Sequence, residues 1–149
     1  MNQVVHVEEH SVGSPTAVFA LLADVTTWTR WAAFDESGLE REGSPAPNGV
    51  GAVRRFRLGR TRSREEVVVF EPDRHLAYTV LSGVPVKGYR ADVTLAPCAD
   101  GGTDITWHAE FRPALPGLGG VIRRRLGAFI TQTAAQLAAA AEQPTRVGG

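Results

Sequence analysis

Residues 103–142 read TDITWHAEFRPALPGLGGVIRRRLGAFITQTAAQLAAAAE, and the spacing of their apolar residues changes once along the stretch. Up to Phe111 apolar and polar residues alternate, which predicts a β-strand over 103–112 with one buried face. Beyond the turn at 113–117 the apolar residues recur at helical spacing to about residue 142. One wide face of this predicted helix carries Ile122, Leu126, Phe129, Ile130, Thr133, Leu137 and Ala140. The stretch therefore predicts a half-buried strand followed by a long amphipathic helix.

Shorter β segments precede this strand and are separated by turn-forming residues. Their predicted ranges are 4–12, 38–43, 51–58, 62–71, 75–82 and 87–97. The intervals between the later segments are too short for crossover helices, so the strands should form an antiparallel meander. After the first strand, Ser14 and Pro15 predict the start of a short helix, because serine caps helices and proline suits the first helical position. Trp28 and Trp31 lie three residues apart, which places both indoles on one side of a second helical turn.

Composition restricts the class of protein. The 149 residues carry 16 basic and 16 acidic side chains, which argues against a nucleic-acid partner because such binders have a dominant basic footprint. With Cys98 as the single cysteine, no internal disulfide forms. The charged N-terminus and the lack of an apolar run of about 20 residues predict neither a signal peptide nor stable membrane insertion. We expect one cytoplasmic domain over 1–142 and a flexible tail at 143–149.

Strand parity predicts which side chains line the space between sheet and helix. In the last strand the inward set is Ile105, Trp107, Ala109 and Phe111. In the strand before it the inward set is Tyr89, Ala91, Val93 and Leu95. For the strand at 75–82 both faces are apolar, so parity alone leaves its orientation open.

Strand parity also applies to charged side chains in the hairpin at 51–71. If Phe56 points inward, so does Arg54, and if Phe70 points inward, so does Glu66. A turn centred at position 60 places Arg54 opposite Glu66 as a charge pair facing the interior. Such a pair is costly to dehydrate, so it indicates a wet cavity or a ligand with a polar end. A hairpin one residue out of phase would instead place these charges on the solvated outer face.

The order of one strand, two short helices, six antiparallel strands and a long helix is that of the helix-grip fold. Several pieces carry a resemblance to one superfamily: Ser14-Pro15 before Val18-Phe19, DVTTWTRW at 24–31, VVFEP at 68–72, HLAYTV at 75–80, GTDITW at 102–107 and Phe111-Arg112-Pro113. Over residues 3–142 the sequence resembles the START-like (SRPBCC) superfamily. Its members include polyketide cyclases/dehydrases, lipid-transfer START domains and the birch-pollen-allergen proteins.

This resemblance implies an α+β fold in which a seven-stranded curved antiparallel sheet wraps around the C-terminal helix and encloses a cavity. It also favours Leu76, Tyr78 and Val80 as inward residues. We therefore expect the protein to bind a hydrophobic or aromatic small molecule, such as a lipid or a polyketide-like compound. The predicted ligand-binding residues are Trp31, Phe34, Arg54, Phe56, Glu66, Tyr78, Tyr89, Trp107, Phe129 and Thr133.

Two other functions are compatible with the same residues. In a polyketide cyclase/aromatase-like enzyme, the pocket would fold a poly-β-ketone, with Arg54, Glu66, Tyr78 or Tyr89 as candidate catalytic groups. In a protein-interaction module, the basic cluster at 123–125 would bind the partner. The arginines of this cluster and of the 51–71 hairpin are either solvated faces or a rim that receives an acyl-carrier protein or an acidic ligand group.

The spacing of the histidine, cysteine and glycine residues does not indicate a metal or cofactor site. His6 and His10 share a strand face but lie about 13 Å apart along the strand, too far to ligate one ion. His108 should face outward, and Cys98 is interpreted as a thiol at the tip of a hairpin. The glycine-rich segments match no phosphate-binding motif. The sequence therefore predicts no metal site and no cofactor.

Overall fold

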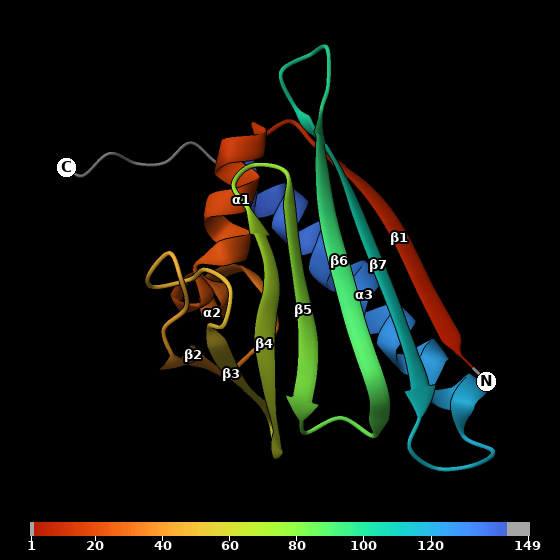
Figure 1. The fold of residues 1–149 in the computed structure, drawn as a ribbon. Coiled ribbons are helices and arrows are strands. Elements are labelled where there is room, and N and C mark those ends of the chain that lie inside the picture. The colour runs from red at the N-terminus through yellow and green to blue at the C-terminus, as the bar shows by residue number, and fades with distance from the viewer. Residues whose placement is uncertain (1, 143–149) are drawn as a thin grey trace.

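Seven antiparallel strands form one curved sheet in the computed structural model, which describes residues 2–142 (Figure 1). The strands are β1 (Gln3–Ser11), β2 (Glu36–Arg41), β3 (Val53–Leu58), β4 (Thr61–Glu71), β5 (His75–Ser82), β6 (Val86–Pro97) and β7 (Thr103–Pro113). Their spatial order is β1-β7-β6-β5-β4-β3-β2, so the chain forms a meander from β2 onward and β1 pairs with the last strand. The tail expected at 143–149 lies outside the described residues.

The helices cover the inner face of the sheet, and α3 lies behind it in the view of Figure 1. They are α1 (Pro15–Ala23), the short 3-10 helix η1 (Val25–Thr27), α2 (Trp28–Trp31) and α3 (Gly119–Ala141). As predicted, the Ser14 side chain accepts a hydrogen bond from the Ala17 N–H, and Pro15 occupies the first turn of α1. This architecture confirms the predicted α+β helix-grip fold.

The buried core confirms the predicted parity of β5, β6 and β7. Trp107 and Phe111 on β7 are each 1% exposed, and Tyr78 and Tyr89 are nearly as well buried. On β1, Val5 points inward and His6 outward. The inward side chains of these neighbouring strands therefore form one continuous wall opposite α3.

A close contact anchors the C-terminal end of α3 to the turn after β1. The Ser11 hydroxyl donates to the carbonyl of Ala138 at 2.8 Å. A Cβ at position 13 would lie 2.4 Å from the carbonyl oxygen of Ala141, so only glycine fits there. This contact fixes the helix across the sheet and leaves the space near its first turns open.

The β3–β4 hairpin differs from its prediction by one residue. Leu58 pairs with Thr61, and Arg54 therefore pairs with Glu65. The predicted pairing of Arg54 with Glu66 was wrong. Arg54 nevertheless points inward, as predicted, and is fully buried. Glu66 instead reaches the Arg41 side chain, with 3.6 Å between Oε2 and Nη2.

A β-bulge explains why parity failed along β4. Val67 pairs with Tyr78 and Val69 pairs with Ala77, so Val68 is an extra residue in the ladder. One extra residue reverses the alternation, so that Glu65, Val67 and Phe70 share the inner face. The sequence prediction assumed unbroken alternation from Phe70 back along the strand. It therefore placed Glu66 on the inner face, where the structure has Glu65.

Candidate functional site

A cavity of about 310 Å³ lies between the inner face of the sheet and α3. Helix α3 contributes Leu126, Phe129, Ile130 and Thr133 to its wall. The sheet contributes Leu58, Thr61, Ser63, Glu65, Tyr78, Val80, Tyr89 and Trp107. Trp28, Phe34 and the loop residues 83–85 complete the lining. The wall is thus mainly aromatic and aliphatic, with a few polar groups, as in most small-molecule sites.

Six of the ten predicted ligand-binding residues line this cavity: Phe34, Tyr78, Tyr89, Trp107, Phe129 and Thr133. The other four lie outside its lining. The indole N–H of Trp31 donates to the Thr27 hydroxyl at 3.1 Å, and Phe56 packs behind Phe34 with ring centroids 4.6 Å apart. Arg54 lies behind the wall, and Glu66 is on the other face of β4.

Glu65 and Arg54 form a charge pair in the cavity wall. Nη2 of Arg54 donates to Oε1 of Glu65 at 2.8 Å, and Nη1 donates to the carbonyl of Leu22 at 3.1 Å. The Glu65 side chain is 13% exposed, whereas that of Arg54 is fully buried. Burial raises the pKa of Glu65 above its ordinary value, although the charge of Arg54 opposes that rise. Glu65 therefore presents to the cavity a carboxyl group that takes up a proton more readily than an exposed glutamate does.

Aromatic rings hold the Arg54 guanidinium in place. Its central carbon lies 5.0 Å from the ring centroid of Trp28, 5.4 Å from that of Tyr78 and 5.6 Å from that of Phe56. A planar guanidinium stacks on aromatic faces and is more weakly hydrated than an ammonium, which suits it to a buried position. The positive charge that pairs with Glu65 is therefore held behind the cavity wall and takes up no space in the cavity.

Two phenols lie beside Glu65 on the same wall. The indole N–H of Trp107 donates to the Tyr78 hydroxyl at 3.2 Å, and the rings of Tyr78 and Tyr89 lie 6.0 Å apart. Burial raises the pKa of both tyrosines, so their hydroxyls stay protonated at neutral pH. Together with Glu65 they form the polar end of an otherwise apolar cavity.

The prediction from the sequence missed Glu65, Thr61 and Ser63. All three come from β4, and their parity is hidden by the run Val67-Val68-Val69, which shows no alternation. The arginine that pairs with Glu65 was predicted, so the missing information was the register of the β3–β4 turn and the position of the bulge.

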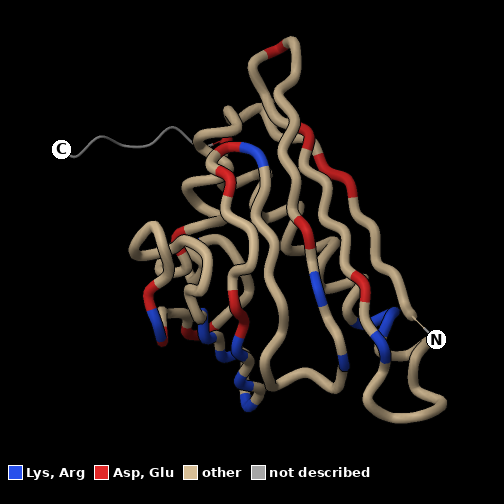
Figure 2. Tube along the Cα trace, viewed as in Figure 1, with Lys and Arg blue, Asp and Glu red and all other residues tan. Residues whose placement is uncertain are grey.

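One end of the cavity lies at the end of the sheet that carries the β3–β4 turn and the β5–β6 loop (Figure 1). Leu58 and Thr61 border it from the β3–β4 turn, residues 83–85 from the β5–β6 loop, and Leu126 from α3. Figure 2 shows most lysine and arginine positions along the chain toward this end of the molecule. Basic residues are therefore concentrated near this end of the cavity.

A second depression lies outside the cavity, along β2, β3 and β4. Four of its charged side chains pair with one another: Arg57 donates to Glu36 at 3.0 Å, and Nε of Arg64 donates to Glu40 at 2.8 Å. This depression is therefore lined mainly by charged side chains, in contrast to the mainly apolar wall of the cavity.

Comparison with models of known protein families assigns the chain to one family. The model for polyketide cyclase / dehydrase and lipid transport matches residues 2–142. The chain belongs to this family. A search of curated proteins gives no match.

Solved structures with the same fold include three bacterial proteins, each with a TM-score of 0.70 or above. XoxI from Bacillus cereus is 17% identical with a TM-score of 0.73, covering 93% of this chain and 94% of its own. An uncharacterized protein from Bacillus thuringiensis is 16% identical with a TM-score of 0.73, covering 96% and 100%. TTHA0849 from Thermus thermophilus is 16% identical with a TM-score of 0.70, covering 94% of each chain. At these identities the likeness concerns the fold alone.

Among residues 2–142, no helix has the length and apolar character that crossing a membrane requires.

Proposed function

We propose that the protein binds a hydrophobic or aromatic small molecule, of lipid or polyketide type, that carries a hydrogen-bonding group at one end. The observation that supports this most strongly is the arrangement of the cavity wall. Its apolar side chains can bury the body of such a ligand, whereas Glu65, Tyr78 and Tyr89 gather the polar groups in one place. Because both phenols are protonated donors, a ketone or phenolate oxygen suits this end.

Cavity size narrows the ligand class. At about 310 Å³ the space lies near the lower bound of about 300–1,000 Å³ that is typical of ligand pockets. This volume favours a compact aromatic ketone or a short acyl chain over a sterol. Phe34 and Phe129, whose ring centroids are 5.5 Å apart, would contact the flat body of an aromatic ligand.

Binding can be tested without knowing the natural ligand. Native mass spectrometry of the purified protein should reveal a retained small molecule, and thermal-shift screening against fatty acids, sterols and aromatic polyketides should find a stabilising class. A chain that carries no ligand and is stabilised by none of the three classes would contradict the proposal.

A second candidate function is catalysis of a polyketide cyclisation, which the placement of Glu65 favours. A carboxylate with a raised pKa can remove a proton from a methylene between two carbonyls. The resulting enolate carbon would bond to a second carbonyl carbon, and a phenol such as Tyr78 or Tyr89 would protonate that carbonyl oxygen. The proton on Glu65 would then return to the phenolate, so both groups recover their starting state.

The catalytic candidate has its own test. Glu65→Gln keeps the shape of the side chain but removes its basicity, so it should abolish turnover of a poly-β-ketone analogue while the analogue still binds. Glu66→Gln, on the other face of the same strand, is the matched control and should leave turnover unchanged. An unchanged product distribution in Glu65→Gln would refute the catalytic role and leave the binding role standing.

A further inference from the structure

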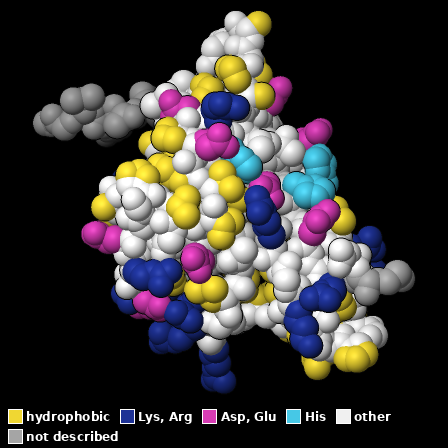
Figure 3. All heavy atoms as spheres, in the orientation of Figure 1, with side chains coloured by type: hydrophobic (Ala, Val, Ile, Leu, Met, Phe, Trp, Pro, Cys, Tyr) yellow, Lys and Arg dark blue, Asp and Glu magenta, His cyan; other side chains and the backbone are white. Residues whose placement is uncertain are grey.

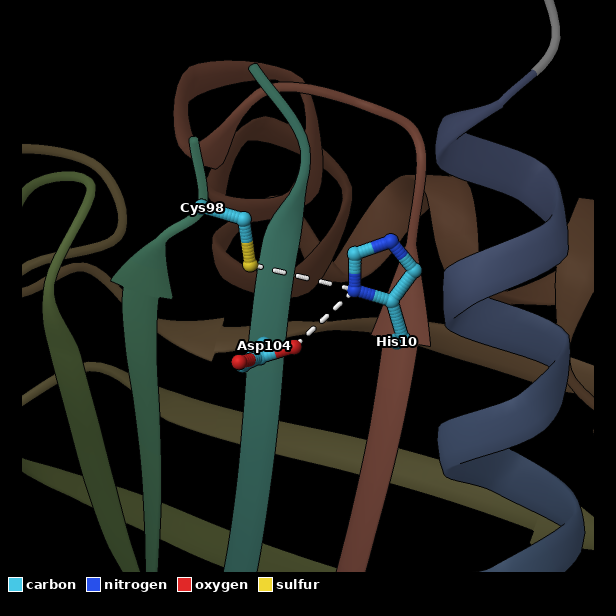
Figure 4. Close-up of side chains that lie close together, drawn as sticks. All are labelled: His10, Cys98 and Asp104. Atoms are coloured by element: carbon cyan, nitrogen blue, oxygen red, sulfur yellow. Dashed lines mark hydrogen bonds and ion pairs between the residues drawn. The ribbon is translucent and has the colours of Figure 1, made fainter. Parts of the chain in front are cut away.

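A cluster of three possible metal ligands lies on the outer face of the sheet, away from the cavity. His10 on β1 and Asp104 on β7 are direct partners in the strand register, and Cys98 follows β6 in the turn that leads into β7. Figure 4 shows the three side chains pointing toward one another. Their ligand atoms all lie within 4.8 Å of each other.

The spacing of these atoms is close to that of a tetrahedral site. Nδ1 of His10 lies 2.9 Å from Oδ1 of Asp104 and 3.8 Å from Sγ of Cys98. With metal–ligand distances of about 2.0–2.3 Å, neighbouring ligands of a tetrahedral zinc ion lie roughly 3.4–3.6 Å apart. Small side-chain rotations therefore suffice to place all three atoms around one ion.

A fourth residue orients the histidine as in established metal sites. Nε2 of His10, the ring nitrogen that faces away from the cluster, lies 3.4 Å from Oδ2 of Asp100. The other carboxylate oxygen of Asp100 accepts the Gly102 N–H at 2.8 Å, which fixes the carboxylate within the turn. A histidine that ligates a metal usually donates its second N–H to such a carboxylate, which directs the free nitrogen at the ion.

We propose that His10, Cys98 and Asp104 bind a zinc-class divalent cation, with Asp100 as the outer partner of His10. The combination of thiolate, imidazole and carboxylate suits Zn²⁺, whereas Mg²⁺ and Ca²⁺ prefer sites made of oxygen ligands. Three protein ligands leave the fourth position to water. The bound ion would connect β1 to the β6–β7 hairpin, so it should stabilise the fold.

The sequence alone pointed away from this site. Spacing along one strand separates His6 from His10, and Cys98 lies 88 residues from His10 in the chain. The antiparallel pairing of β1 with β7 brings the three groups together, and that pairing joins the two most distant strands of the sequence. A non-local strand pair of this kind cannot be recognised from short-range motif spacing.

The test uses the reduced full-length protein and the metals alone. Isothermal titration should give one Zn²⁺ site, and Co²⁺ should give visible bands of a tetrahedral ion together with a thiolate charge-transfer band in the near ultraviolet. Cys98→Ser and His10→Ala should each lower Zn²⁺ affinity by about 100-fold or more, and Asp100→Asn by about 10-fold. The ligand side chains are exposed or only half-buried, so these variants should fold like the parent in the absence of metal.

A second histidine pair on the same face provides the matched control. Figure 3 shows the histidines on this outer surface. His6 and His108 are cross-strand partners with their Nδ1 atoms 3.0 Å apart, but they have no thiol beside them. The His6→Ala/His108→Ala variant should keep both the Zn²⁺ site and the charge-transfer band. Absence of Zn²⁺ binding, or binding that survives Cys98→Ser and is lost in the control variant, would overturn the proposal.

Discussion

Two arginine–glutamate pairs link strands at the same edge of the sheet, yet they lie in opposite environments. Arg54 on β3 pairs with Glu65 on the neighbouring strand β4, whereas Arg64 on β4 reaches past β3 to Glu40 on β2. Arg54 and Glu65 are 2.8 Å apart in the cavity wall, and Arg64 and Glu40 are 2.8 Å apart on the outer face. Burial raises the pKa of the interior carboxyl, whereas the hydrogen bond from Arg64 lowers the pKa of the outer one. The same two residue types thus differ in their chemistry because one pair is buried and the other is exposed to water.

This comparison indicates what each pair does. The outer pair is screened by solvent and contributes little to stability. The interior pair gives up hydration, and its carboxylate faces a space large enough for a ligand. A carboxylate in this position is consistent with the proposed binding of a ligand that carries a polar group.

The largest effect should come from breaking the interior pair. Arg54→Met leaves Glu65 buried beside apolar side chains without its cation, which should lower the free energy of unfolding by about 3–5 kcal/mol. The double variant Arg54→Met/Glu65→Leu removes both charges and should recover most of that loss. Urea denaturation measures both values. If the double variant is as unstable as the single one, the buried charge is not the cause.

A smaller loss should follow removal of the Tyr78 hydroxyl. Tyr78→Phe leaves the buried indole N–H of Trp107 without its acceptor, which should lower the free energy of unfolding by about 1–3 kcal/mol. Tyr89→Phe removes a phenol on which that N–H does not depend, so it should destabilise less. Denaturant unfolding measures the stability loss of each variant. A larger loss in Tyr89→Phe than in Tyr78→Phe would contradict the hydrogen bond from Trp107 to Tyr78.

The two glutamates should give pH dependences of opposite sign. Because the pKa of Glu65 is raised on folding, its contribution to stability is full below the ordinary pKa and is lost as pH rises through the folded value. Because the pKa of Glu40 is lowered, its contribution is present above the ordinary pKa and is lost as pH falls. Relative to Glu65→Gln the parent should therefore weaken with rising pH, and relative to Glu40→Gln it should strengthen.

Unfolding measured from about pH 2.5 to 8 covers both changes, because the Glu40 contribution is lost below the ordinary glutamate pKa and the Glu65 contribution above it. Slopes of the same sign for the two Gln variants would show that the interior and outer carboxyls do not differ as described.

The smallest effect should come from breaking the outer pair. Arg64→Met leaves Glu40 exposed to water, which can solvate it, so the denaturation midpoint should stay close to that of the parent. A loss comparable to that of Arg54→Met would remove the distinction between the two pairs.

The regular half of the sheet could be predicted from the sequence, and the bulged half only in part. In β6 and β7 the alternation around Val93 and Trp107 is unbroken, so the inward residues were identified correctly. In β4 the bulge at Val68 reverses the inward face, and the β3–β4 turn lies half a residue from its predicted centre. Because of these two features the carboxylate partner of Arg54 was assigned one position away, and no local pattern reveals either of them. Side chains brought together by α3 or by the pairing of β1 with β7 depend on contacts that sequence periodicity does not encode.

The measurement that tests the binding proposal most directly is a titration with prodan, a neutral naphthyl ketone whose emission reports the polarity around it. We expect one site with blue-shifted emission in the parent protein, because the ring would lie against Phe34 and Phe129. Leu126→Trp fills the cavity from α3 and should abolish binding. Val121→Trp adds the same residue at an exposed position of the same helix and should leave binding unchanged. Equal binding by both variants, or no binding by the parent, would contradict a ligand site in this cavity.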